Sequence, residues 1–357
     1  MREAGGEPKG VPMTATSQPA GAEPPAAAAF RIVMGLTSAW WQLGALRALV
    51  DIGGLEELSG GPLAADELAR RCGASAELLP KVLRSVAALG LIRTASPGTY
   101  ELTDVGRALL GSSALAGVRF HCDPEVWGAI GELPEALRAG TAPFVARHGN
   151  AYEYMATRPD TAAAFYDLMG REFGPVAEAL ASAIDFGGLG TVVDVGGGEG
   201  GFITAILRAH PGTRGVLADL PLALPEARGK LAASGLADRC EVVACDFFAD
   251  ALPAGAGGYL LAHIIHNFAD EQAVAVLRAV RAAVRPDGRL VLVELVLPDD
   301  DAPHWAKDLD IRMMSFQPGG ERTGPEYESL LARAGFQLQS VTHLHRGQSA
   351  IVGVPVG

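Results

Sequence analysis

A glycine-rich turn between an apolar run and a helical pattern is the strongest constraint on the fold of this chain. Residues 191–195 are rich in β-branched side chains, residues 196–201 read GGGEGG, and residues 202–209 show the apolar spacing of a helix. Glycines allow a backbone to turn sharply and to approach a ligand closely. A strand, a glycine turn and a helix in this order predict an α/β domain with a ligand-binding turn.

The segments after this turn repeat the alternation of strand and helix. Further strands are expected at residues 215–219, 241–244, 258–262, 290–295, 337–344 and 349–354. Further helices are expected at residues 221–233, 271–284 and 324–334. This order predicts a mostly parallel sheet with helices on both faces, as in a Rossmann-like domain.

The residues before this domain predict a second, smaller one. Residues 30–49 place apolar side chains on several faces of a helix, which favours burial, including burial against a second subunit. Two short helices near residues 63–71 and 76–89 follow, and then two short strands around the turn at residues 96–99. Helix, helix and hairpin in that order predict a winged helix-turn-helix.

The charge of the chain favours one of two possible functions of a winged helix, DNA binding or dimerisation. The formal net charge is −12, and the helix that would read DNA offers only Lys81 and Arg84 as cations. DNA-binding domains normally carry a basic footprint, and an acidic surface repels phosphate backbones. We therefore favour a structural or dimerisation module over a DNA-binding regulator and expect no nucleic-acid partner.

Signals for membranes and for secretion are absent from the sequence. No apolar run reaches the roughly 20 residues that span a membrane, and the N-terminus lacks a basic-then-apolar signal pattern. The four cysteines have neither zinc-ligand nor disulfide-framework spacing. We expect a cytoplasmic protein with reduced thiols and no membrane partner.

Two carboxylates downstream of the turn narrow the choice of ligand. Asp219 ends the second strand, 21 residues after Gly198, where an acidic side chain meets ribose hydroxyls. Asp246 follows the third strand, where it can accept from an adenine amino group while Phe247 packs on the ring. Glu199 lies inside the turn, which disfavours the pyrophosphate of NAD or FAD and suits a cationic methionine end. These features predict S-adenosylmethionine, held by Asp194, Gly196, Gly198, Glu199, Asp219, Leu220, Asp246 and Phe247.

A histidine and two glutamates form the candidate catalytic group. His266 follows the strand at residues 258–262, at the carboxyl edge where open α/β sheets bind their ligands. A neutral imidazole is a suitable general base for a phenol or a similar acidic hydroxyl. Glu294 ends the next strand and can orient the imidazole, and Glu321 is a third candidate for the same pocket.

The same histidine permits an alternative interpretation as a metal ligand. His263 and His266 have the HxxH spacing of a metal pair. No third ligand follows at a helpful spacing, so we predict that the site holds no metal.

Five motifs in a fixed order connect the chain to a known family. They are DVGGGEG at residues 194–200, ADLP at 218–221, CDFF at 245–248, HNFADE at 266–271 and GGERT at 319–323. Over about residues 30–355 the chain resembles the plant caffeate-type (family 2) small-molecule O-methyltransferases, whose bacterial branch acts on polyketides, anthracyclines and related aromatic natural products.

The resemblance implies both an architecture and a chemistry. It implies a homodimer formed through the N-terminal domain, with S-adenosylmethionine as methyl donor and S-adenosylhomocysteine as product. It implies that His266 is the base and that Glu294 and Glu321 flank it. We therefore divide the chain into a disordered tail (residues 1–25), a winged-helix dimerisation domain (26–112), a helical linker and substrate-pocket region (113–185) and a Rossmann-like catalytic domain (186–357).

The chain also departs from the family pattern beside the base. The family usually has His-Asp-Trp where this chain has His266, Asn267 and Phe268, and it often has Lys or Arg where this chain has Ala262 and His263. Some relatives keep the cofactor but catalyse C-methylation, hydroxylation, decarboxylation or pericyclic steps, and the retained His266 favours O-methylation over these.

An apolar pocket for a flat, largely aromatic acceptor is expected beside the base. Methionine adapts to irregular ligands, although core packing is an equal alternative for each apolar side chain. The pocket residues expected from the sequence are Trp127, Phe165, Met169, His263, Asn267, Met313, Met314 and Phe316.

Overall fold

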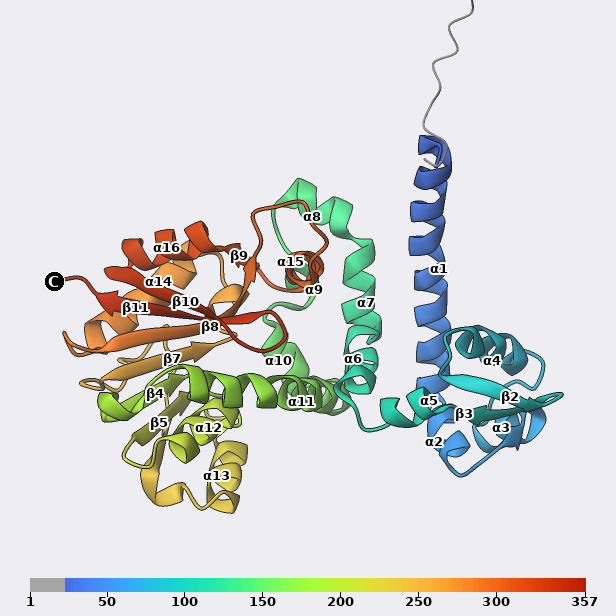
Figure 1. The fold of residues 1–357 in the computed structure, drawn as a ribbon, viewed down its shortest axis with the longest axis horizontal. Helices are drawn as coiled ribbons and strands as arrows, with labels where there is room; N and C mark the ends of the chain where they lie inside the picture. The colour runs from blue at the N-terminus through green and yellow to red at the C-terminus, as the bar shows by residue number, and fades with distance from the viewer. Residues whose placement is uncertain (1–22) are drawn as a thin grey trace, which may run out of the picture. The chain divides into compact units, whose positions relative to one another are not determined.

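The computed structural model describes residues 23–357, which form two compact units that meet between Thr103 and Asp104 in the sequence (Figure 1). The tail predicted at residues 1–25 lies outside the described residues, apart from its last three. The first helix, α1, begins at Pro25. The four-part division of the chain stays a prediction.

The N-terminal unit contains short elements around a small antiparallel sheet. Its elements are α1 (Pro25–Asp51), α2 (Gly54–Ser59), β1 (Leu63–Ala64), α3 (Ala65–Arg71), α4 (Leu79–Ala88), β2 (Ile92–Ser96) and β3 (Thr99–Leu102). The sheet order is β1-β3-β2. The expected succession of two helices and a hairpin is present, although residues 63–64 form a strand rather than the start of a helix.

Helix α1 is far more exposed within its own unit than its apolar pattern predicts. Phe30, Leu36 and Trp40 are 69%, 70% and 60% exposed, and only Leu49 and Val50 in the last turn are buried. The prediction of burial is therefore wrong for the single chain. The remaining alternative from the sequence is burial against a second subunit.

A run of helices opens the second unit. These are α5 (Asp104–Leu109), α6 (Ser113–His121), α7 (Pro124–Gly131), α8 (Leu133–Ala139), α9 (Pro143–His148), α10 (Ala151–Ala156) and α11 (Pro159–Ala183). Several begin with proline in the first turn, where a missing N–H costs nothing. Aromatic rings of these helices, among them Phe120, Phe144 and Phe165, gather in one cluster with Phe316 from a later part of the unit.

The sheet of the second unit has the mostly parallel order that the sequence predicts. Its path is β10-β11-β8-β7-β4-β5-β6. The parallel strands are β4 (Thr191–Val195), β5 (Arg214–Asp219), β6 (Cys240–Ala244), β7 (Gly258–Ala262) and β8 (Arg289–Leu297), and the antiparallel strands are β10 (Phe336–His343) and β11 (Gln348–Pro355). The chain leaves β4 in one direction for β5 and returns on its other side as β7. That reversal creates the switch point where such sheets bind ligands.

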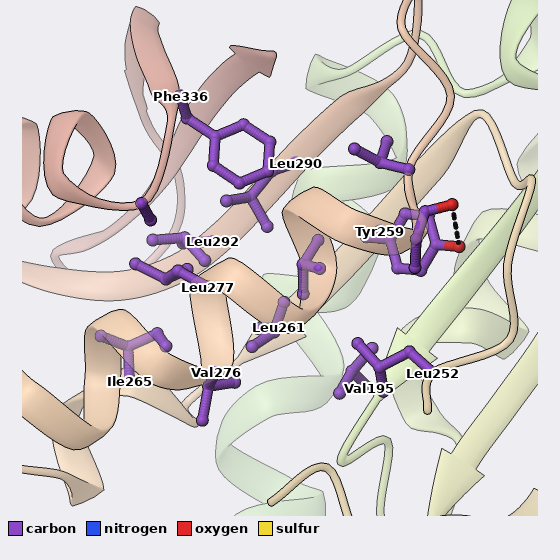
Figure 2. Close-up of a cluster of buried hydrophobic side chains, with 14 of the residues drawn as sticks. Val195, Leu252, Tyr259, Leu261, Ile265, Val276, Leu277, Leu290, Leu292 and Phe336 are labelled. Carbon is purple, nitrogen blue, oxygen red and sulfur yellow. Dashed lines mark hydrogen bonds between the residues drawn. The ribbon is translucent and has the colours of Figure 1, made fainter. Parts of the chain in front are cut away.

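Helices cover both faces of this sheet. One apolar cluster packs α14 (Asp270–Ala283) and α16 (Gly324–Arg333) against the strands, and Figure 2 shows part of it around Tyr259, Leu277 and Phe336. The other cluster packs α11, α12 (Gly201–Ala209) and α13 (Leu224–Ala233) on the opposite face (Figure 1).

Two further elements were not expected from the sequence. They are helix α15 (Trp305–Phe316) and the short strand β9 (Arg322–Thr323), which pairs with the end of β8. Strand β9 holds residue 322 beside the carboxyl end of β8, and so it brings the GGERT segment to the same edge as the end of β7.

Candidate functional site

The glycine turn joins β4 to α12 and is held by the carboxylate that ends β5. Gly196 and Gly198 have φ of 71° and 54°, a left-handed conformation that favours glycine. A Cβ on Gly196 would lie 2.5 Å from Cδ1 of Ile264, so the turn also approaches the segment after β7. The Gly198 N–H donates to Oδ2 of Asp219 at 2.7 Å.

Asp219 has part of its hydrogen-bonding capacity already engaged. Its Oδ1 accepts from the Leu220 N–H at 2.6 Å. Burial raises the pKa of Asp219, and the hydrogen bonds from Gly198 and Leu220 oppose that rise. The carboxylate therefore lies between the glycine turn and the end of β5, and each of its oxygens accepts a hydrogen bond from a backbone N–H.

Asp194 lies beneath the same turn with one oxygen unsatisfied. It is 1% exposed, and its Oδ2 has no hydrogen-bond partner. Burial first, and then the charge of Asp219, raise the pKa of Asp194 to about 7. A buried acceptor without a donor costs free energy and fits a ligand that brings an N–H group.

The remaining predicted cofactor residues lie around the turn. The carboxylate of Glu199 pairs with Lys230, with 3.3 Å between Oε2 and Nζ, so its charge is partly balanced. Oδ1 of Asp246 accepts from the Phe248 N–H at 2.9 Å. The ring of Phe247 contacts that of Phe268, with centroids 5.9 Å apart.

One cavity of about 1350 Å³ in the second unit joins these residues to the predicted acceptor side. All eight residues predicted to hold the cofactor line it. Four predicted pocket residues line it as well, namely Phe165, Met169, His263 and Asn267. The cavity is large enough to hold a nucleoside-type cofactor and an aromatic molecule together.

The other four predicted pocket residues lie elsewhere. In the described part of the chain the cavity wall does not include Trp127, Met313, Met314 or Phe316. Phe316 instead packs its ring against Phe144 at 4.4 Å, and Met313 is buried. For Met313 and Phe316 the structure thus shows core packing, the alternative that the sequence left open.

Several lining residues are not among the eight pocket residues expected from the sequence. Tyr152, Tyr166 and Phe173 carry no local pattern beyond aromatic character, and Gln317 and Pro318 follow the unexpected helix α15. Only an assignment of α10, α11 and α15 would have placed them.

His266 stands in a short 3-10 turn, Ile265–Asn267, directly after β7. Its Nδ1 lies 2.8 Å from Oε1 of Glu321 and 3.7 Å from Oε2 of Glu294. The His266 side chain is 12% exposed, and both glutamate side chains are fully buried. The cavity wall includes His263, Ile264 and Asn267, the neighbours of His266 on either side.

The two glutamates set the protonation of this imidazole. Burial acts against the charged form of His266, but Glu294 and Glu321 outweigh it, so the pKa of His266 is raised. Burial raises the pKa of Glu294 to about 7, although the neighbouring His266 opposes this. Oε1 of Glu294 accepts from the Ile265 N–H at 2.8 Å and so fixes the turn that carries the histidine.

The neighbours of His266 shape the turn. His263 has φ of 57°, and its ring stacks on Phe173 with centroids 3.7 Å apart. Burial first, and then His266, lower the pKa of His263 well below its ordinary value, so this ring is neutral. Nδ2 of Asn267 donates to the carbonyl oxygens of His263 and Ile264. A carboxylate cannot donate these bonds, so Asn267 has a structural role here that the family's aspartate cannot share.

A metal ion has three potential ligands in this region. Atoms of His263, His266 and Glu294 lie within 4.8 Å of one another in the described residues. The hydrogen bond from His266 to Glu321 uses Nδ1 and leaves Nε2 of the same ring for another partner. The absence of a metal stays a prediction.

Comparison with known proteins gives consistent matches along the chain. An O-methyltransferase domain model matches residues 130–337, and an O-methyltransferase dimerisation domain model matches residues 34–112. Phenazine O-methyltransferase PhzM of Lysobacter antibioticus is 32% identical over 330 residues, covering 91% of this chain and 96% of that protein.

Solved structures agree with these matches. The mitomycin 7-O-methyltransferase MmcR superposes with a TM-score of 0.87 at 31% identity, covering 93% of this chain and 99% of the other. The O-methyltransferase NcsB1 of neocarzinostatin biosynthesis, in complex with S-adenosylmethionine and 2-hydroxy-5-methyl naphthoic acid, has a TM-score of 0.78 at 31% identity. That match covers 88% of this chain and 96% of the other.

Proposed function

This chain belongs to the O-methyltransferase family, and from that premise we propose that His266 is the general base for methyl transfer to an aromatic hydroxyl. The chain is an S-adenosylmethionine-dependent methyltransferase of natural-product biosynthesis and forms a homodimer. The assignment of roles to residues rests on the hydrogen bond between His266 and Glu321 beside the cavity that contains the glycine turn.

The residues around the turn fit the cofactor. Asp219 suits the ribose hydroxyls, and Asp246 with Phe247 suits the adenine. Asp194 offers a buried acceptor without a donor, which fits a ligand with an amino group. When bound, S-adenosylmethionine supplies an activated methyl group on a positively charged sulfur.

His266 prepares the acceptor for transfer. Because Glu321 is the acceptor at Nδ1, that nitrogen carries the proton and Nε2 keeps a lone pair. Nε2 then takes the proton of the acceptor hydroxyl as its oxygen becomes nucleophilic. Glu321 and Glu294 stabilise the resulting imidazolium, and their burial strengthens this effect because water screens it less.

The acceptor is proposed to be a flat aromatic molecule with a phenolic hydroxyl. Phe165, Tyr166 and Phe173 supply aromatic wall, and Met169 adds an adaptable apolar contact. Relatives that act on a phenazine and on naphthoates support a ring system of two or three fused rings.

We propose that this enzyme is cytoplasmic. None of the helices that the structure describes is long and apolar enough to cross a membrane. The four cysteines, Cys72, Cys122, Cys240 and Cys245, are free in the described residues.

The purified homodimer tests the role of His266. We expect mass spectrometry to show a gain of one methyl group on members of a panel of hydroxynaphthoic acids and hydroxyphenazines. In His266→Ala, kcat should fall by about 10²- to 10⁴-fold, whereas calorimetric binding of S-adenosylhomocysteine should not change. His345→Ala, on an exposed loop, is the matched control.

Two results would contradict these assignments. An unchanged kcat in His266→Ala would exclude the proposed base. A product of different mass, with no added methyl group, would instead favour one of the other reaction types known among cofactor-binding relatives.

A further inference from the structure

Arg322 in β9 has a buried guanidinium whose five N–H groups all have acceptors. Its side chain is 8% exposed. Nε and Nη2 donate to Oδ1 of Asp270 at 3.1 and 2.9 Å. Nη1 donates to the carbonyl oxygens of Ile265 and Gly320 at 3.3 Å each, and Nη2 also donates to the carbonyl oxygen of Phe268 at 2.8 Å. Among side chains, only arginine offers five donors in one rigid plane.

Two of these carbonyl groups flank the histidine proposed as the base. His266 lies in the 3-10 turn Ile265–Asn267, which we call the base turn, and Phe268 follows it. The carbonyl oxygen of Ile265 accepts from the Phe268 N–H, which closes the turn, and also from Arg322. The guanidinium is therefore bonded to the first residue of the base turn and to the residue that ends it.

The third carbonyl group belongs to the segment that carries Glu321. Gly320, which directly precedes Glu321, supplies this carbonyl. The backbone of Arg322 pairs with β8 two residues beyond Glu294. One planar group thus connects the base turn with the segments that carry both glutamates.

The backbones of these segments pack against each other directly. A Cβ on Gly319 would overlap the carbonyl oxygen of His266 and would lie 2.7 Å from the carbonyl carbon of Asn267. Glycine at 319 therefore permits the close approach, and the bonds of Arg322 to Asp270 and to the carbonyl groups maintain it. Asp270 and Arg322 belong to the HNFADE and GGERT motifs, and the proposed chemistry gives neither of them a role.

We propose that Arg322 is a positioning residue for methyl transfer, which holds the base turn where Glu321 can orient the imidazole of His266. The hydrogen bond between His266 and Glu321 joins side chains 55 residues apart, so it depends on how their backbones are placed. Misplacement of a reacting group by about 1 Å can lower a rate by about 100-fold. This inference rests on the proposed role of His266, and it adds the residue that keeps the imidazole aligned.

Substitutions at position 322 separate charge from geometry in the purified homodimer. Arg322→Lys keeps the charge beside Asp270 but has three donors instead of five. Its kcat should fall by about 10-fold, and that of Arg322→Gln by about 100-fold. KM should change by less than about 2-fold, because alignment rather than binding is lost. Arg333→Gln is the matched control with wild-type kcat, since Arg333 pairs with Asp270 from the more exposed side, together with Glu271.

Calorimetric binding of S-adenosylhomocysteine separates alignment from folding. Every kcat is expressed per binding site measured in this way, so unfolded enzyme does not enter the comparison. Arg322→Lys should bind S-adenosylhomocysteine like the wild type. Loss of cofactor binding in this variant would show that Arg322 is needed for the fold and would overturn the proposed positioning role.

A double-mutant cycle tests whether Arg322 acts through Glu321. Glu321→Ala removes the acceptor at Nδ1 of His266. In that background, Arg322→Lys should lower kcat by less than about 3-fold, because the alignment that it disturbs is already lost. Losses that multiply would show that the two residues act independently, and they would contradict the inference.

Proton NMR follows the hydrogen bond itself and does not depend on turnover. A proton on Nδ1 of His266 that is buried and bonded to Glu321 should exchange slowly with water and give a downfield resonance, identified by its loss in His266→Ala. The resonance should persist in Arg333→Gln and disappear in Arg322→Lys. Its persistence in Arg322→Lys, or its absence from the wild type, would refute the inference.

The two proposals can fail separately. Loss of the resonance in Arg322→Lys together with full methylation by His266→Ala would exclude His266 as the base and leave the positioning of its imidazole by Arg322 intact. Persistence of the resonance together with an inactive His266→Ala would leave the base intact and exclude the role of Arg322.

Discussion

Nδ1 of His266 lies 2.8 Å from Oε1 of Glu321, which is 55 residues further along the chain. The two side chains meet because the end of β7 and the pairing of β9 with β8 bring their segments to one sheet edge. Glu321 is itself held there, since its N–H donates to Oδ1 of Asp310 at 2.8 Å. The hydrogen bond from its own backbone therefore helps to fix Glu321 beside His266.

Removal of the Glu321 charge should shift the pH dependence of methylation. The base must be neutral, so kcat/KM should rise with pH through the pKa of His266, which the two glutamates raise. In Glu321→Gln this pKa falls, so the acidic limb of the profile should move to lower pH. The plateau should also fall, because the imidazolium loses stabilisation. An acidic limb that stays in place would show that the carboxylate does not control the base.

Asp219 should be required for cofactor binding. Asp219→Ala removes the carboxylate that holds Gly198 and faces the predicted ribose position. We expect the Kd for S-adenosylhomocysteine to rise by about 10- to 100-fold, the value of a hydrogen bond to a charged group. Calorimetry measures this, with the exposed Asp238→Ala as control. Wild-type affinity in Asp219→Ala would contradict the assignment.

The free energy of unfolding of the ligand-free enzyme should fall as the pH rises, because Asp194 loses its proton. Its pKa is about 7 in the folded chain against an ordinary 3.8, so the folded state retains a proton that the unfolded state releases. The stability that the protonated Asp194 contributes to the folded state is fully present below pH 3.8 and is lost as the pH rises through about 7.

Asp194→Asn removes this dependence. At about 1.4 kcal/mol per pKa unit, its free energy of unfolding relative to wild type should increase by about 2–3 kcal/mol between pH 5 and pH 8. Urea denaturation at both pH values checks this, and a constant difference between the two proteins would refute it.

Helix α1 should form part of the homodimer interface. Leu36 and Trp40 are 70% and 60% exposed and lie within the segment that matches the dimerisation domain model. The double variant Leu36→Glu/Trp40→Glu should be a monomer in light scattering after gel filtration. Leu137→Glu, at an equally exposed leucine of the second unit, should stay dimeric. A dimeric double variant would place the interface elsewhere.

Chelation should not affect methyl transfer. His263, His266 and Glu294 are close enough to hold an ion, but a general base needs the imidazole lone pair for the acceptor proton. Dialysis against EDTA should leave kcat unchanged, and added Zn²⁺ should inhibit by occupying His266. Loss of activity on dialysis with recovery on addition of a metal would favour the metal interpretation.

The catalytic domain could largely be predicted because its signals are local. The alternation of strand and helix places β4, β5 and β7 within one residue of their observed bounds. The spacing from Gly198 to Asp219 follows from the length of one helix and one strand, so it identifies the edge where both residues meet.

Helix α15 and its side-chain contacts could not be predicted from the sequence pattern. Its residues combine apolar and charged side chains without a clear apolar face, so no helix was expected there. Met313 and Phe316 have the composition of a ligand pocket, but the structure buries them in contact with other side chains of the unit. Whether an apolar side chain meets a ligand or a neighbour depends on which helices pack beside it.

The sequence by itself determined the Rossmann-like order, the glycine turn and the identity of the candidate base. These properties depend on backbone preferences and on spacing over a few tens of residues. Only the tertiary structure decided that His266 bonds to Glu321 rather than to Glu294 and that Phe316 packs on Phe144. Both depend on distances between segments far apart in the chain, and burial changes the energy of a charge more than any local pattern records.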